Sequence, residues 1–174
     1  MKIILLIPAL LFAASAHAAP SPASGELSEA GPLMFGGGPY FTPNPTSDVE
    51  TNGVGTITCM DPILPCDRFA LTVNISDEFR MDEANKREGA VFSLNFTAAT
   101  AELDAQADFE LYLDDAAGTR VAQSVSTSGI TESFRLPLAT LKNGDYVVPV
   151  LPYQPLGGSY TVAIQLDKDR KKSA

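Results

Sequence analysis

The single histidine of this 174-residue chain, His17, lies within its first eighteen residues. That segment has a basic Lys2, an uncharged apolar run and a small-x-small site at Ala16-His17-Ala18, the pattern of a secretory signal peptide. We expect residues 1–18 to be removed and the protein to be secreted or periplasmic. A mature chain without histidine has no residue for a Ser-His-Asp triad, a Cys-His dyad or a His-ligated metal site.

Two cysteines, Cys59 and Cys66, are the next reactive side chains. In an oxidising compartment an even number of cysteines indicates a disulfide. Six residues separate the two, whereas a redox-active pair usually has two residues between its cysteines. We therefore expect a structural disulfide, which stabilises the fold by roughly 2–3 kcal/mol through closure of a short loop.

Four carboxylates lie close together in the sequence: Asp108, Glu110, Asp114 and Asp115. Calcium needs several oxygen ligands, so this set is a candidate calcium site, although the EF-hand spacing is absent. The preferred alternative is a solvated acidic strand face, with Asp115 forming a turn. Two carboxylates can also hydrolyse glycosides, but 21 acidic residues make chance pairs common.

Four aromatic residues are candidates for exposed contacts. Tyr112 alternates outward along its predicted strand, while Tyr40, Phe41 and Tyr153 lie in segments rich in proline and glycine. An alternative is that Tyr40 and Phe41 cover an open end of the fold. The chain has no tryptophan, and its net charge of −9 argues against nucleic acid as a partner.

Apolar residues recur with a period of two from residue 53 onward, which is typical of strands with one buried face. About eight short strands joined by turns predict an all-β, antiparallel sandwich over residues 33–166. Residues 19–32 are predicted to be a flexible linker and 167–174 a charged tail, and only 77–88 has a helical pattern. No stretch after the leader is long and apolar enough to span a membrane.

The order of motifs from Phe92 to Leu166 resembles the bacterial pre-peptidase C-terminal domain family. These motifs are a D-x-x-L-Y-L-x-D-like strand at 108–114, a D-x-x-G turn at 115–118, and G-x-Y strands starting at Gly144 and Gly158. The resemblance covers roughly residues 36–166. It implies a jelly-roll-like sandwich and a non-catalytic module of secreted enzymes, some relatives of which bind collagen, insoluble polysaccharide or calcium.

These observations predict a secreted, non-catalytic module with no catalytic residue and no certain cofactor, Ca²⁺ being the one candidate. It would bind an extracellular polysaccharide or protein, or serve as an accessory to an exported enzyme. One alternative is a structural or chaperone-like partner without a ligand of its own. A small hydrolase that uses carboxylates is the weaker alternative.

Overall fold

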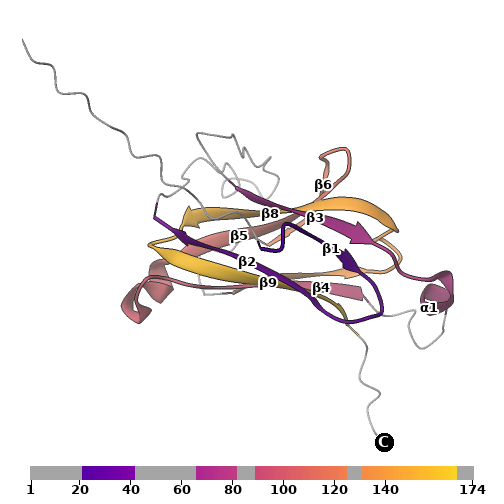
Figure 1. Ribbon diagram of the computed structural model, residues 1–174, viewed down its shortest axis with the longest axis horizontal. Coiled ribbons are helices and arrows are strands. Elements are labelled where there is room, and N and C mark those ends of the chain that lie inside the picture. Colours follow the sequence, from indigo (N-terminus) through magenta and orange to yellow (C-terminus); the bar gives the residue numbers. More distant parts are fainter. Residues whose placement is uncertain (1–20, 42–65, 82–88, 125–130, 168–174) are drawn as a thin grey trace, which may run out of the picture.

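The computed structural model describes residues 21–41, 66–81, 89–124 and 131–167, and within them nine strands form two sheets packed face to face (Figure 1). The five-stranded sheet has the order β1 (Ser24–Leu27), β3 (Asp67–Val73), β8 (Gly144–Gln154), β5 (Asp108–Asp115) and β6 (Arg120–Ser124). The four-stranded sheet has the order β2 (Leu33–Tyr40), β9 (Gly158–Asp167), β4 (Gly89–Thr97) and β7 (Thr131–Pro137).

The strand pairing is that of a jelly roll. Counted inward from the two ends, β2 pairs with β9, β3 with β8, β4 with β7 and β5 with β6, all antiparallel. Such nested pairs arise when one long hairpin rolls up into two sheets. Only β1 lies outside this scheme, since it runs parallel to β3 at the edge of its sheet. The prediction of an all-β, jelly-roll-like sandwich is confirmed.

Alternation of side chains explains where the core lies. Along β3 the residues alternate strictly between buried and exposed, with Phe69, Leu71 and Val73 pointing inward. The two inner faces meet through aromatic rings: Phe35 stacks on Phe69 at 4.0 Å, and Phe96 contacts Phe109 at 5.1 Å between centroids. The core therefore joins both sheets along their length.

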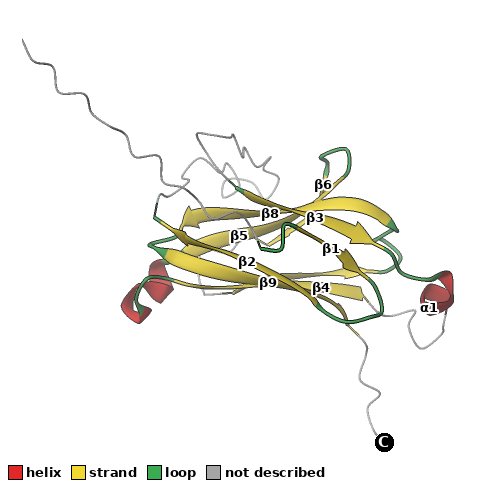
Figure 2. Cartoon of the chain, viewed as in Figure 1, coloured by secondary structure: helices red, strands yellow, loops and turns green. Residues whose placement is uncertain are grey.

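Two short helical segments lie at opposite ends of the sandwich (Figure 2). The helix α1 (Asp77–Met81) begins where the sequence predicts a helix, and residues 82–88 lie outside the described part. The 3-10 helix η2 (Ala101–Gln106) lies at the opposite end. No helix in the described ranges is long and apolar enough to cross a membrane.

The predicted linker over residues 19–32 is wrong for the part that contains β1. Ser24 to Leu27 pair in register with Ala70 to Val73, and the Leu27 side chain is fully buried. This segment forms a strand because β3 offers it an open edge and the core offers its one leucine a site. The folded domain therefore begins before residue 33. The predicted leader (1–18) lies outside the described residues, as does nearly all of the predicted tail.

Candidate functional site

A buried polar cluster links the two sheets at one end of the sandwich. Tyr40 on β2 and Tyr160 on β9 both donate their phenol hydrogen to Oδ2 of Asp67 on β3. All three side chains are buried. A Cβ on Gly37 would lie only 2.5 Å from Oδ2 of Asp67, so the glycine makes room for the carboxylate. The cluster fixes the relative position of the strands that carry it.

The two phenols are held in the protonated form. Burial raises the pKa of Tyr40 far above its usual 10.0, and the hydrogen bond to Asp67 and the charge of Asp67 raise it further. Burial raises the pKa of Tyr160 in the same direction, followed by the charge of Asp67. Both groups are therefore hydrogen-bond donors at neutral pH, and the cluster is structural. The prediction of Tyr40 as an exposed contact is wrong, because only 1% of it is accessible.

A hollow of about 270 Å³ lies on the outside of the four-stranded sheet, where β4 runs beside β9. We call it the β4–β9 hollow. Its lining comprises three cross-strand pairs, Asn95 with Thr161, Phe96 with Tyr160 and Thr97 with Ser159. Phe96 and Tyr160 are buried, whereas the other four residues are exposed. The hollow therefore offers hydroxyl and amide groups and no charge.

Phe41 lies at the same end of these strands. Its side chain is 68% exposed, and a Cβ on Gly157 would lie 3.1 Å from its Cε1 atom. The Gly157 N–H donates to the carbonyl of Tyr40 at 2.8 Å, which ties the end of β2 to the turn before β9. Phe41 is thus an exposed ring next to the turn that leads to Ser159, and the prediction that it is exposed is confirmed. Tyr153 is half-buried, and its role as a contact stays a prediction.

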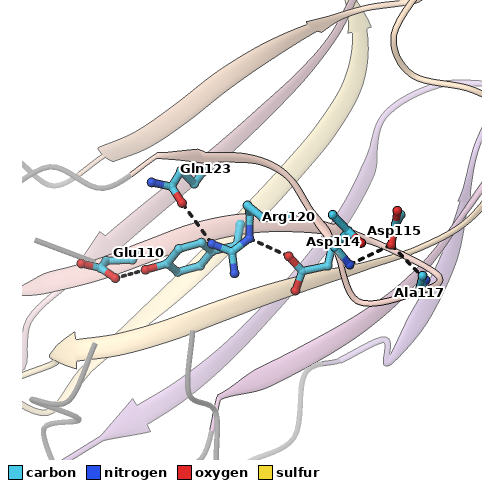
Figure 3. A network of polar contacts seen from close by, with 8 residues as sticks. Glu110, Asp114, Asp115, Ala117, Arg120 and Gln123 are labelled. Carbon is cyan, nitrogen blue, oxygen red and sulfur yellow. Dashed lines mark hydrogen bonds and ion pairs between the residues drawn. The ribbon is translucent and has the colours of Figure 1, made fainter. Parts of the chain in front are cut away.

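A second polar network lies on the outer side of the five-stranded sheet, along β5 and β6 (Figure 3). Tyr112 donates its phenol hydrogen to Glu110, and the Arg120 guanidinium lies 4.2 Å from the centre of the Tyr112 ring. Nε of Arg120 also forms an ion pair with Asp114 at 2.6 Å. Burial and then the charge of Glu110 raise the pKa of Tyr112 far above its usual range, so this phenol also remains a donor.

This network corrects two predictions for β5. Glu110 and Tyr112 were expected to face solvent, but Glu110 is 1% exposed and Tyr112 fully buried. They do lie on the outer face, as alternation requires. However, Tyr112 packs against Leu151 and Cys66, and Arg120 lies over its ring. An outward position therefore does not mean an exposed one here.

The four candidate calcium ligands are not brought together. Asp115 uses its Oδ1 atom to accept hydrogen bonds from the backbone N–H groups of Ala117 and Thr119, at 2.9 and 2.8 Å. Its predicted turn-forming role is confirmed. Within the described ranges, no three His, Cys, Asp or Glu side chains lie close enough to hold a metal ion. The set of Asp108, Glu110, Asp114 and Asp115 is therefore wrong as a joint metal site.

The predicted disulfide is only half within the described residues. Cys66 is half-buried at the start of β3 and packs against Tyr112 and Leu151. Cys59 lies outside the described part, so the pairing stays a prediction.

Sequence reasoning missed Asp67 and the β4–β9 hollow. Alternation along β3 places Asp67 on the same inward face as Phe69, but the sequence does not show which donors would meet a carboxylate there. The outward positions of Asn95 and Thr97 are predicted by alternation, but their pairing with Thr161 and Ser159 depends on a register that the sequence does not fix.

No protein-family model matches the chain, and no curated protein is significantly similar to it. The resemblance to the pre-peptidase C-terminal family therefore stays an expectation.

Proposed function

We propose that this protein is a secreted, non-catalytic binding module that holds an extracellular macromolecule at one end of its jelly roll. The observation that carries this proposal is the exposed ring of Phe41 at the end of the sheet where hydroxyl and amide groups also line the β4–β9 hollow. Single exposed apolar residues are common on protein surfaces, but an exposed aromatic next to convergent polar groups is the chemistry of a contact site.

The rigidity of this end supports the proposal. Tyr40 and Tyr160 flank the site along β2 and β9, and their bonds to Asp67 anchor both strands to the other sheet. Binding costs less conformational entropy when the contacting groups are already held in place. The buried cluster therefore suits a surface that recognises a ligand without rearrangement.

A catalytic role for the acidic residues of β5 has less support. Glu110 is buried and accepts from Tyr112, Asp114 is paired with Arg120, and Asp115 holds a turn. Each of these three carboxylates thus has a structural partner that accounts for its position. A hydrolase would instead need two carboxylates facing one cleft at a suitable separation.

Retention of the full chain on insoluble material tests the proposal. We expect the protein to be retained by at least one member of a panel of cellulose, chitin, starch granules and fibrillar collagen, with serum albumin as the unretained control. If none of these materials retains this protein more than serum albumin, the result would instead favour a structural partner without a ligand of its own.

A further inference from the structure

We propose that residues 21–29, which contain β1, form an exchangeable strap, and that the edge of β3 is a docking site for the strap of a second copy of this chain. The inference goes beyond the proposed binding function and does not depend on it. It starts from the topology. Among the described strands, only β1 lies outside the nested hairpin pairs, and it joins its sheet at the edge, parallel to β3 (Figure 1).

The strap contacts both sheets of the sandwich. The backbone N–H of Ser21 donates to the carbonyl of Gly36 on β2 at 3.0 Å. The backbone N–H of Asn74, directly after β3, donates to the carbonyl of Leu27 at 3.0 Å. The strap therefore crosses from the edge of one sheet to the edge of the other and covers backbone groups of both.

The shape of the docking site selects the residues of the strap. The side chain of Leu27 is fully buried in the core. Two residues earlier, a Cβ on Gly25 would overlap Cδ1 of Leu33 and lie 3.1 Å from Cζ of Phe69. A larger side chain at that position would displace Leu33, so the site fits an extended segment with glycine two residues before leucine.

Polar contacts fix the far end of the strap. The carboxylate of Glu29 accepts hydrogen bonds from the backbone N–H and the hydroxyl of Ser76, at 2.8 and 2.7 Å. The carboxylate of Glu26 accepts one from the side-chain amide of Asn74 at 3.2 Å. These partners all lie in the body of the sandwich, so an identical copy offers the same contacts. The strap of a second copy is therefore an occupant whose shape and chemistry match the site.

Residues 30–32 form the hinge between the strap and β2. Gly31 has a φ of +146°, a conformation that other residues rarely adopt. A Cβ on Gly31 would meet no atom within 4 Å beyond its chain neighbours, so this point of the hinge is not packed against the body. A strand that is held by contacts with the body and joined to it by a short, unpacked turn is suited to domain exchange.

Exchange keeps the contacts of the strap, because the dimer makes between two copies what the monomer makes within one. The cost is association. The strap of a monomer is held near its own docking site at an effective concentration of about 1 mM. We therefore expect monomers when the chain refolds at about 1 μM, and a fraction of exchanged dimers when it refolds at about 1 mM.

The first test measures the molar mass of the refolded full chain by light scattering at both concentrations. Gly31→Ala strains the closed hinge, and this strain is relieved when the hinge opens. Gly144→Ala is the matched control: Gly144 has a φ of +144° and equally open surroundings, but it lies at the start of β8. We expect Gly31→Ala to favour the dimer by about five- to hundredfold per hinge, and Gly144→Ala to leave the dimer fraction unchanged.

The second test identifies the contact that joins the copies. Glu26 and Thr72 are partners in the register of β1 and β3, and both are exposed. In the double variant Glu26→Cys, Thr72→Cys, oxidation forms a disulfide within one chain of a monomer but between two chains of an exchanged dimer. A non-reducing gel separates these products. Glu26→Cys alone is the control for bonds to the native cysteines.

We expect a covalent dimer of the double variant after refolding at about 1 mM. Monomers at every concentration would overturn the proposal, and this result needs only the unchanged chain, so it stands even if a variant does not fold. A dimer of the double variant whose new disulfides lie within each chain would overturn it too. Equal dimer fractions for Gly31→Ala and Gly144→Ala would show that the hinge does not control assembly, which also contradicts it.

Discussion

Replacing Tyr160 by phenylalanine removes one of the two phenol donors to Asp67 while keeping the ring that packs against Phe35 and Phe109. A hydrogen bond to a charged, buried group contributes roughly 1.5–3 kcal/mol. We therefore expect Tyr160→Phe to lower the free energy of unfolding by about that amount. For a domain of this size, the melting midpoint would fall by roughly 3–12 °C.

Tyr40→Phe should have an effect of similar size, because Tyr40 donates to the same oxygen of Asp67. Each single variant leaves one phenol donor in place, whereas the double variant leaves the carboxylate without either. We expect the double variant to lose about 0.5–3 kcal/mol more than the sum of the two single changes. Urea unfolding followed by far-UV circular dichroism measures all three, since it does not depend on tyrosine emission.

Tyr146→Phe is the matched control for these variants. Its hydroxyl bonds to the backbone of Lys142 near the surface, at 3.1 and 3.2 Å, so its loss should cost less than about 1 kcal/mol. The reasoning is refuted if Tyr160→Phe is no more destabilising than Tyr146→Phe.

Three further predictions follow from the polar contacts. Burial raises the pKa values of Tyr40, Tyr112 and Tyr160 in the folded state, so the contribution of these three phenols to stability is constant below about pH 10 and is lost as the pH rises above it. In a spectrophotometric titration these three of the five tyrosines should ionise only as the far-UV signal is lost, and full ionisation of a folded chain would contradict this. Asn143→Ala removes the amide that accepts a hydrogen bond from the N–H of Ile75 at 3.0 Å and donates one to its carbonyl at 2.8 Å. We expect the free energy of unfolding in urea to fall by roughly 1–3 kcal/mol, whereas an unchanged midpoint would show that these two bonds do not stabilise the fold. The melting midpoint of Asp114→Asn should respond to millimolar Ca²⁺ as that of the unchanged protein does, because the β5 carboxylates do not lie close enough together to hold a metal ion. A shift of the midpoint that occurs in the unchanged protein and is abolished in this variant would show that these carboxylates are ligands after all.

The architecture was accessible from the sequence because alternation reports directly which side chains face the core. Phe92, Leu94 and Phe96 were predicted to share one face of a strand, and all three are buried. Even Glu132, which interrupts the apolar pattern of its strand, is buried on the expected face, where it accepts a hydrogen bond from Ser124. One polar residue does not change the direction of a strand whose other inward residues are apolar.

The details of the site were not accessible in the same way. Alternation states the direction of a side chain, but burial also depends on what packs over it, and for this reason Glu110 and Tyr112 were misjudged. Tyr40 lay in a segment whose glycines and prolines suggested a loop, yet the segment is an edge strand that places the ring against Phe109 and Tyr160. Asp67 acquires its role only through partners 27 and 93 residues away in the chain.

The most direct test of the account is depletion of the full chain from solution by cellulose, chitin, starch granules and fibrillar collagen, compared for the unchanged protein, Phe41→Ala and Met81→Ala. Met81 is the matched control, because it is 69% exposed, as Phe41 is 68%, but lies on α1 at the opposite end of the sandwich (Figure 1). We predict that the unchanged protein and Met81→Ala bind alike and that Phe41→Ala binds about tenfold more weakly. Binding that survives loss of the Phe41 ring, or that is absent from all three proteins, would contradict the claim that this end of the jelly roll binds a macromolecule.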